Sequence, residues 1–575
     1  RRLLVRLSQQ RPLLVVIEDA HWAEPTFVDL IEHVVAAGRE APMLVLCLVR
    51  PEFFEDHPDW TAESIVIGGL SPEDSGDLLK LLVPGLAGGE ADREQIVATA
   101  SGNPLFLEQL AAFTAERKGA DRAGVPPTLR SLLSARLDRL GPGERAVLER
   151  AAVVGREFWA GAVADLLPPE GRPTLARHLA ALARKGLIDA DPSPAPFEQA
   201  FRFRHVLIQE AAYRSLPKWR RAELHEGVAG WLERSPHGLN ADEDQVLGYH
   251  LEQAYRYRAE LGPVDDELRL LGERAGDRLE AAGRRALDRE DAPAAVNLLG
   301  RALTLLADHP AGPRLSVRLA EALELAGEVE RAYSCLGETI EEARRSGDHR
   351  NEWLAATQHA LLGVQVVPQQ WTSELVTETA TRALEVFQAL DDDLGLARGW
   401  LLMAAPLFGK CRYDEAASHY RRALVHAERT GDERETLLVR DCLHQALCFG
   451  SAHVSVVRAE AEAMIARAEG HPRATAFALL TLASVTAMSG EAQESRQLYL
   501  RAKSIAEEMG LGFLIAVAPF FSQDVGLLFG DPEFTEREAR AAASARSARH
   551  PATMHRDTHG QDRSSAAASR SRPWP

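Results

Sequence analysis

The sequence predicts a mainly α-helical protein that starts with a partial α/β core, continues as a winged helix and ends in a superhelical array of α-helix pairs. Three observations lead to this prediction. Ala, Leu, Arg and Glu dominate the 575 residues and aromatic residues make up only 6%, a composition that favours helix. An apolar run followed directly by two acids stands near the start of the chain. Amphipathic segments broken by Gly, Asp or Pro then fill residues 240–535.

The composition is that of an ordinary soluble protein, with 46% apolar and 26% charged residues. The length suggests about three or four folding units. A net charge of −18 argues against a general nucleic-acid surface. No apolar run approaches the ~20 residues that span a bilayer and no signal peptide opens the sequence, so we expect no membrane contact. The five cysteines form no CxxC pair, which predicts reduced thiols of a cytoplasmic protein.

The apolar run at residues 13–17 (LLVVI) predicts a parallel strand buried on both faces. Glu18 and Asp19 follow it directly. Because open α/β sheets bind ligands at the carboxyl ends of their strands, both acids are candidate site residues. Two adjacent carboxylates would repel each other unless a cation or a magnesium-bound phosphate lay between them. The alternative is a strand followed by a solvated turn.

The next segments predict a strand–helix–strand unit of a parallel sheet. Residues 26–37 predict a helix and residues 43–49 a second strand, which ends at Arg50. Residues 64–69 predict a third strand. The apolar stripe of the helix consists of Phe27, Leu30, Ile31 and Val34.

A helical segment follows and is interrupted at residues 101–107 (SGNPLFL). Its first helix has Ser71 as the predicted N-cap and Pro72 in the first turn. Within the interruption, Gly102 can end one helix and Pro104 can start the next. Ending one helix and starting the next would by itself explain why Gly102 and Pro104 stand here, without any functional role.

In this order, these features resemble the signal-transduction ATPases with numerous domains, which are regulatory relatives of AAA+ machines. Residues 15–22 (VVIEDAHW) resemble the Walker B strand of that family. The resemblance makes Glu18 and Asp19 the metal-binding and catalytic residues: Glu18 would hold Mg²⁺, directly or through water, and Asp19 would orient or deprotonate the attacking water. ATP and Mg²⁺ are therefore the implied cofactors.

The resemblance also assigns three nucleotide-binding residues. Arg50 corresponds to the sensor that reads the γ-phosphate, against the alternative of a solvated arginine at a strand end. Gly102 and Pro104 belong to a motif whose proline end packs near the adenine. Residues 1–118 would then form the C-terminal part of a P-loop ATPase domain with its helical lid.

The chain departs from the family in two ways. Glu18 stands where relatives more often have Asp. The Gly-rich string GxxxxGK[ST], whose amides and lysine hold the phosphates, occurs nowhere in the sequence. We therefore interpret the chain as a fragment that has lost the front of its ATPase core, and we expect it neither to hydrolyse ATP nor to hold it tightly.

Residues 124–234 predict a winged helix. Helical patterns at 129–140, 142–154, 159–167 and 174–185 are followed by strands at 187–190 and 200–204. Residues 203–208 (FRHVLI) resemble a family signature in which His205 would contact the nucleotide, whereas the alternative is a neutral core histidine bonded to a backbone carbonyl. Arg184 and Lys185 could contact DNA phosphates. The resemblance implies a regulatory lid instead, so we do not expect direct DNA contact.

Residues 240–535 share a template of a Gly or Asp turn, a small residue, a bulky residue and Ala, which resembles tetratricopeptide-type repeats. The template alanines are Ala295, Ala332, Ala416 and Ala502. The first three of them are spaced by 37 residues and by 84 residues, or two units of 42, and both spacings exceed the usual ~34. Lengthened repeats of the kind in maltose-regulator-like activators fit better. Residues 541–575, rich in Ser, Ala and Arg, predict a disordered or non-native tail.

The leading hypothesis is a piece of an ATP-dependent regulatory switch, linked to transcription or to a cyclase, in which the repeats sense a protein or small-molecule effector. Its status as an enzyme stays open, and self-association is an additional partner prediction. A first alternative is a non-catalytic repeat scaffold for a protein partner. A second is a DNA-binding regulator that uses the winged helix.

Overall fold

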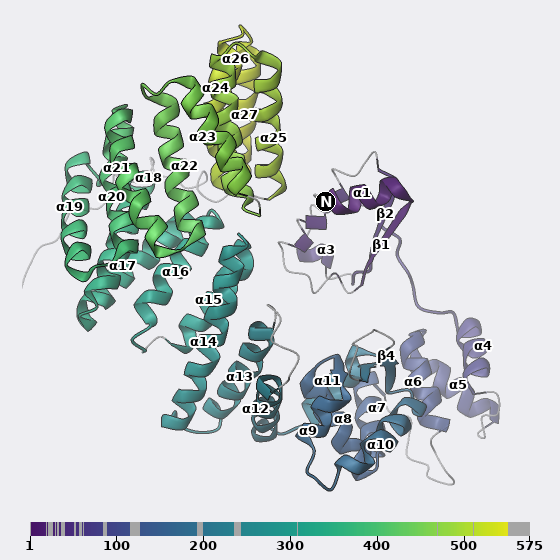
Figure 1. The fold of residues 1–575 in the computed structure, drawn as a ribbon. Coiled ribbons are helices and arrows are strands. Elements are labelled where there is room, and N and C mark those ends of the chain that lie inside the picture. The colour runs from purple at the N-terminus through teal and green to yellow at the C-terminus, as the bar shows by residue number, and fades with distance from the viewer. Residues whose placement is uncertain are drawn as a thin grey trace, which may run out of the picture. The chain divides into compact units, whose positions relative to one another are not determined.

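The computed structural model describes residues 2–549 with several gaps, and the chain divides into two compact units (Figure 1). The first unit comprises residues 1–282 with 304–306, and the second comprises residues 283–303 with 307–575. No described helix is long and apolar enough to cross a membrane. The gaps fall at residues 19, 21–26, 29, 32–33, 36–40, 51–52, 57–59, 61–62, 84–88, 116–126, 192–198, 235–242, 307–308, 469 and 510.

The first unit opens with a two-stranded parallel sheet. Helix α1 (Arg2–Gln10) leads into β1 (Leu13–Ile17), which pairs in parallel with β2 (Met43–Cys47). Both predicted strands are thus confirmed, although β2 ends two residues earlier than expected. A short helix, α3 (Phe53–Asp56), follows.

Two predictions for this α/β part are wrong. Both strands alternate between half-buried and exposed residues, with Leu14 58% and Leu44 62% exposed, so neither is buried on both faces. One face of a sheet of two described strands has no second layer to cover it. Residues 64–69 form no strand: Ile65, Val66 and Ile67 are 84–91% exposed, because β-branched residues make a strand only where a neighbouring strand pairs with them.

The predicted helix 26–37 lies partly outside the described residues. Its described positions are helical, and Ile31 and Val34 are buried as expected. Phe27 and Leu30 are instead 43% and 47% exposed, and Val28 is buried in their place. The buried stripe therefore lies one position away from the predicted one at its N-terminal end.

A three-helix group forms the next part of the first unit. Helices α4 (Pro72–Leu82), α5 (Gly89–Ala100) and α6 (Pro104–Ala115) pack around a core that includes Leu79, Ile96 and Leu107. The predicted cap is confirmed, since Ser71 Oγ accepts from the amide of Asp74 at 3.0 Å. Such a cap stabilises a helix by about 1 kcal/mol.

The following domain combines helices with an antiparallel sheet of order β3-β5-β4. The predicted helices and the two predicted strands are present. The structure adds a third strand, β3, directly before α9, and it shares only Trp159 with the helix expected over 159–167. A strand of three residues is too short to give an alternating pattern in the sequence. It is held in place by tertiary packing, since Phe158 of β3 stacks on Phe201 of β5 at 5.8 Å. The elements are α7 (Leu129–Asp138), α8 (Pro142–Val154), β3 (Glu157–Trp159), α9 (Ala160–Leu166), α10 (Leu175–Arg184), β4 (Ile188–Asp191) and β5 (Ala200–Phe203).

Four helices complete the first unit: α11 (Val206–Ser215), α12 (Lys218–Arg234), α13 (Glu243–Ala259) and the first part of α14 (Asp266–Asp288). Their shared core is aliphatic, but its centre holds a polar chain of buried side chains. His225 Nε2 lies 2.8 Å from Tyr213 Oη, and His225 Nδ1 lies 2.8 Å from His250 Nδ1. Burial lowers the pKa of His225 to about 3 and that of His250 to about 4, so both rings are neutral.

The second unit is an array of antiparallel helix pairs. We call the even-numbered helices α16–α26 the A helices and the odd-numbered helices α15–α27 the B helices. They are α15 (Ala292–Leu305), α16 (Gly312–Leu325), α17 (Val329–Ser346), α18 (His349–Val366), α19 (Ser373–Leu390), α20 (Asp393–Gly409), α21 (Tyr413–Thr430), α22 (Glu433–Phe449), α23 (Val454–Arg467), α24 (Pro472–Met488), α25 (Ala492–Glu508), α26 (Gly512–Leu527) and α27 (Pro532–Arg549).

Helix contacts define a continuous superhelical array. Within residues 312–549, consecutive helices pack against each other and every A helix also contacts the next A helix along the chain. The A helices begin at residues 312, 349, 393, 433, 472 and 512, so the repeats are 37 to 44 residues long. The prediction of lengthened helix-pair repeats is therefore confirmed.

The B helices repeat a buried pattern at their fourth, eighth and eleventh residues. In α15 to α25 every one of these side chains is at most 6% exposed, and many are small enough to let neighbouring helices approach closely. The template alanines are among them. The three sets are Ala295, Ala332, Val376, Ala416, Val457 and Ser495; Leu299, Leu336, Ala380, Tyr420, Ala461 and Tyr499; and Ala302, Thr339, Ala383, Ala423, Met464 and Ala502.

The predicted disordered tail from residue 541 is wrong for its first part. Helix α27 continues to Arg549, because the alanines and arginines of this stretch have high helix propensity. The rest of the predicted tail lies outside the described residues.

Candidate functional site

Glu18 and Arg50 stand at the same edge of the parallel sheet. Glu18 follows the last residue of β1, and the chain after β2 stays beside it, since the Leu48 amide donates to the Ile17 carbonyl at 2.8 Å and the Ala20 amide to the Leu48 carbonyl at 3.0 Å. Both side chains are exposed. This edge is the carboxyl end of both strands, as the sequence predicted. Asp19 lies outside the described residues.

Gly102 and Pro104 connect α5 with α6. Gly102 has a left-handed backbone (φ 75°), and its carbonyl accepts from the Leu70 amide at 2.8 Å. A Cβ at Gly102 would lie 2.6 Å from the Leu70 carbonyl oxygen, so only glycine fits there. Asn103 Oδ1 accepts from the Phe106 amide at 3.0 Å, and Pro104 opens α6. This interruption therefore ties the start of α4 to the α5–α6 junction.

His205 is the N-cap of α11. Its backbone is extended, and Nδ1 accepts from the Leu207 amide at 3.2 Å. The ring is half-buried, and its partner in this contact is a backbone N–H. The alternative prediction, a core histidine bonded to a backbone carbonyl, would require a different contact. The preceding residue, Arg204, lies 3.7 Å from Glu108 of α6 and 3.7 Å from Asp189 of β4. The ion pair with Glu108 thus links the residue before His205 to the helix that Pro104 opens.

A buried arginine fixes α6 to the sheet-containing domain. Arg136 of α7, 2% exposed, donates to Gln109 of α6 and to the Lys185 carbonyl at 2.7 Å. Arg139 lies over the Phe113 ring at 4.2 Å. Sequence reasoning missed these residues, because an arginine in an amphipathic helix is ordinarily assigned to the solvated face.

Of the two residues predicted to be able to contact DNA phosphates, Arg184 and Lys185, Lys185 already has an ion-pair partner within the protein. Lys185 Nζ lies 2.5 Å from Glu144 Oε2. Burial alone would raise the pKa of Glu144, but the bond from Lys185 and the Gly141 amide together lower it. Glu144 is therefore charged at neutral pH and competes with phosphate for Lys185.

The structure gathers the candidate residues into two groups. Glu18 and Arg50 share the sheet edge, while Gly102 and Pro104 lie at the start of α6 and His205 caps α11. The roles in nucleotide and metal binding stay predictions.

The A helices carry a buried ion cluster that the sequence did not indicate. Arg398 of α20 lies 2.6 Å from Glu321 of α16 and 3.0 Å from Glu435 of α22, and Arg434 lies 3.3 Å from Glu321. Arg398, Glu321 and Glu435 are only 6–14% exposed. Since Glu321 and Arg434 are 113 residues apart, the row of A helices curves back on itself, and we call its concave side the inner face.

Further polar groups lie along the A helices near this cluster. Gln358 of α18 donates to Glu324 of α16 at 3.3 Å. Neither carboxyl oxygen of Asp441 in α22 has a hydrogen-bond partner, although the residue is 3% exposed. Burial raises the pKa of Asp441 well above its ordinary value, against the lowering effect of Arg473. One sequence signal existed: Arg398 is a single charge in the otherwise apolar stretch 394–407.

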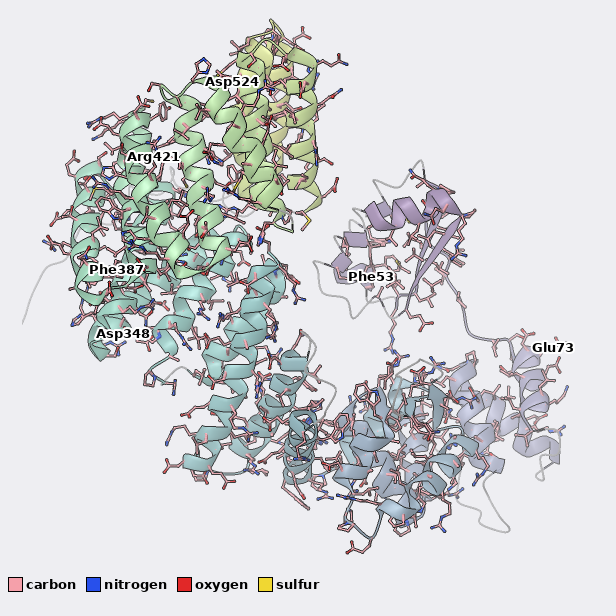
Figure 2. The ribbon with its side chains drawn as sticks, in the orientation of Figure 1. Phe53, Glu73, Asp348, Phe387, Arg421 and Asp524 are labelled. Carbon is pink, nitrogen blue, oxygen red and sulfur yellow. The ribbon has the colours of Figure 1, made fainter. Side chains whose placement is uncertain are left out.

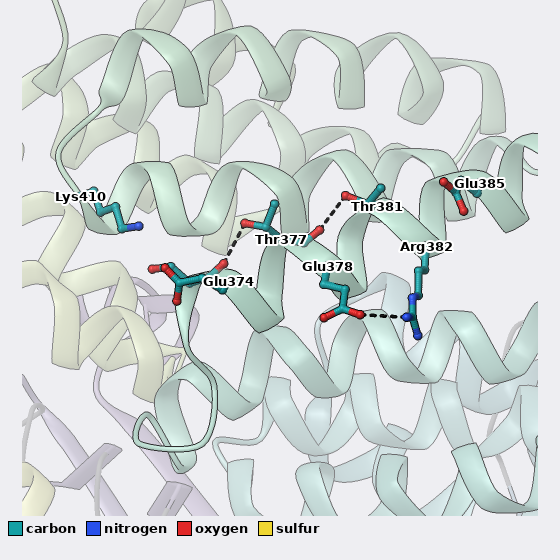
Figure 3. Close-up of a pocket in the computed structure, with 8 residues that line it drawn as sticks. Glu374, Thr377, Glu378, Thr381, Arg382, Glu385 and Lys410 are labelled. Carbon is teal, nitrogen blue, oxygen red and sulfur yellow. Dashed lines mark hydrogen bonds and ion pairs between the residues drawn. The ribbon is translucent and has the colours of Figure 1, made fainter.

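A shallow depression lies on the outer face of the array along α19 (Figure 3). Four of its polar groups already have partners: Thr377 and Thr381 donate to carbonyls of their own helix at 2.8 Å, and Glu378 pairs with Arg382 at 2.8 Å. Nothing here converges on a ligand, so the inner face is the better candidate site.

Comparison with known proteins gives remote likenesses. No protein-family model matches the sequence. An uncharacterized protein of Rhizobium meliloti (strain 1021) is 26% identical over 257 residues, which cover 40% of this chain. The match spans only 24% of that protein's length.

Solved structures are similar at low identity. A signal transduction ATPase with numerous domains and a tetratricopeptide repeat sensor, from Pyrococcus horikoshii, is 15% identical with a TM-score of 0.39, covering 96% of this chain and 82% of that one. A Rap protein complexed with competence and sporulation factor is 12% identical with a TM-score of 0.40, covering 58% and 93%. With TM-scores of 0.39 and 0.40, these likenesses say nothing about function. The proposed function therefore rests on the contacts described above.

Proposed function

We propose that this chain is part of a nucleotide-linked regulatory switch whose helix-pair array binds a protein or peptide effector. The observation that supports the proposal most strongly is the row of A helices, which curves to form an inner face with buried polar and charged side chains. Extended curved surfaces of this kind suit peptide segments. Charged groups inside such a surface give a ligand specificity rather than bulk affinity.

The nucleotide part of the proposal rests on the sheet edge. Glu18 offers one carboxylate suited to Mg²⁺ and Arg50 one guanidinium suited to phosphate. The described residues fit these groups only in part, since no Gly-rich phosphate loop with its lysine accompanies them. ATP with Mg²⁺ would supply the charge to which the predicted regulatory lid at residues 124–234 responds. This chain would bind the nucleotide weakly.

Isothermal titration of the full chain with Mg²⁺-ATP, together with a phosphate-release assay, tests this part. We expect no tight binding and no hydrolysis above background. A hydrolysis rate that disappears in Glu18→Gln would show that the chain is a competent ATPase and would contradict the proposal. Asp77→Asn, which changes an exposed acid of α4, serves as the matched control.

A fixed panel of synthetic peptides, incubated with the full chain, tests the array. Gln358→Ala on the inner face should weaken the strongest binder by roughly tenfold, about 1.4 kcal/mol, while Thr377→Ala on the outer face should leave it unchanged. Equal effects of the two variants, or no binding at all, would reject the inner face as the effector site.

A repeat scaffold without nucleotide control is the second candidate. Stacked helix pairs form a binding surface by themselves, so the array alone would suffice for this role. Partner recovery that is the same with and without ATP would support the scaffold, whereas nucleotide-dependent recovery would support the switch. Direct DNA binding is disfavoured by the Lys185–Glu144 ion pair.

We place the protein in the cytoplasm as part of this proposal. All five cysteines are free. Burial raises the pKa of Cys442 and of Cys448 to about 12, so these thiols are protonated and unreactive. Free, inert thiols suit a reducing compartment.

A further inference from the structure

Two glutamates from the start of the array close its inner face. Glu321 of α16 accepts from Arg398 of α20 and Arg434 of α22. Glu290, in the turn between α14 and α15, accepts from the backbone amide of Arg473 at the start of α24 with a 3.1 Å separation. These contacts join residues 77, 113 and 183 positions apart. In both contacts a carboxylate from the early helices accepts from donors of the later A helices, guanidinium groups for Glu321 and a backbone amide for Glu290.

The later A helices carry a positive surplus once these glutamates are set aside. Of Arg398, Arg434 and Arg473, Arg398 then keeps one carboxylate partner, Glu435, at 3.0 Å. The carboxyl group of Asp441 adds no charge while it is protonated, and its two oxygens are without partners. Arg473 has its guanidinium over the Phe477 ring at 5.7 Å. The surface that Glu321 and Glu290 cover therefore matches an anionic ligand.

We propose that the inner face of the array is a binding site for an acidic peptide segment, and that Glu321 and Glu290 occupy it as internal substitutes for the ligand's carboxylates. This inference rests on the proposed function and adds the chemical class of the effector. An incoming carboxylate replaces Glu321 on Arg398 and Arg434, and the superhelical turn between α16 and α22 opens. The measured affinity for the effector is therefore lowered by the free energy needed to break the internal contacts of Glu321 with Arg398 and Arg434.

The burial of the cluster explains why an exchange of partners is required. Glu321 and Arg398 are 14% and 13% exposed, and an arginine stripped of its carboxylates in such a site would be strongly destabilised. A carboxylate ligand keeps the guanidinium paired throughout. With a neutral or cationic peptide, Arg398 would keep only Glu435 and Arg434 would lose its carboxylate partner, so the site discriminates by charge.

The test is fluorescence anisotropy of labelled hexaglutamate with the full chain, compared with hexaglutamine and hexalysine. The wild-type protein should bind hexaglutamate in preference to both. Glu321→Gln should bind it more tightly by roughly tenfold, since the internal competitor has lost its charge. Arg434→Gln, which changes a partly exposed residue with one ion pair, should weaken binding by roughly tenfold or more.

Controls separate a ligand-binding role from a merely structural one. Glu338→Gln, an exposed glutamate on the B helix α17, should change nothing. If Glu321 only stabilises the fold, Glu321→Gln lowers the unfolding midpoint without tighter binding, and this result overturns the inference. Binding of hexaglutamine or hexalysine in place of hexaglutamate overturns it too, but leaves an effector-binding array intact. Failure of the entire peptide panel would instead reject the proposed function.

Discussion

At the scale of single residues, Asp441 makes stability depend on pH. Its pKa is raised by burial, so the folded chain binds this proton more tightly than the unfolded chain, whose Asp pKa is about 4. The wild-type free energy of unfolding should therefore fall as pH rises from about 4 through the folded-state pKa. Asp441→Asn should lose this part of the slope.

Urea unfolding of both proteins between about pH 4.5 and 8 measures the difference. Asp432→Asn is the control, because Asp432 is a helix cap that accepts from the Glu435 amide at 3.1 Å and should keep the wild-type slope. Parallel curves for the wild-type protein and Asp441→Asn would show that the buried carboxyl does not titrate in this range.

Glycine positions in α20 give a second prediction at this scale. A Cβ at Gly395 would lie 2.1 Å from Cδ1 of Phe387, which is fully buried in the array (Figure 2). Gly395→Ala should destabilise the protein by about 1–3 kcal/mol through overpacking. At Gly409, near the other end of the helix, a Cβ meets nothing within 4 Å, so Gly409→Ala should be neutral or stabilising by up to about 1 kcal/mol. Thermal unfolding decides, and equal midpoints for the two variants would contradict the packing at Gly395.

The residues that could be predicted from the sequence are those whose role is set by near neighbours. Ser71 caps a helix within three residues, and the template alanines recur at the spacing of the helix-pair repeats. Arg136 and Arg398 could not be predicted, because their partners stand 27 to 77 residues away. Nothing in the local pattern separates Arg136 from a solvated arginine, and the apolar stretch around Arg398 marks that residue as unusual without indicating its partners.

At the scale of elements, His205 should act as the cap of α11. His205→Ala removes the acceptor for the Leu207 amide and should cost about 1 kcal/mol, whereas His205→Asp supplies another acceptor and should recover most of it. Urea unfolding of the three proteins provides the comparison. An aspartate variant as unstable as the alanine variant would show that the ring matters for something other than the cap.

Helices were more predictable than strands for a physical reason. A helix satisfies its backbone within its own segment, so periodicity and caps suffice for the array helices. A strand depends on partners: residues 64–69 have β-branched residues but no ladder, and β3 is only three residues long yet pairs with β5. The carboxyl edge shared by Glu18 and Arg50 was predictable because the parallel pairing of the two strands was.

At the scale of the whole molecule, tandem helix pairs were predictable from repeated small residues, but the curvature of the array was not. Curvature follows from the contacts that close the inner face, and these join helices far apart in sequence. The candidate site of the array therefore emerges only from the structure, whereas the nucleotide residues come from the sequence and remain to be tested.

Peptide-resolved hydrogen–deuterium exchange of the full chain, with and without the strongest binder of the peptide panel, tests the effector role of the array most directly. Bound peptide should change amide exchange in the A helices α16, α20 and α22, and leave the outer helix α19 unchanged. Changes confined to α19 and other B helices, or to the first unit alone, would contradict binding at the inner face.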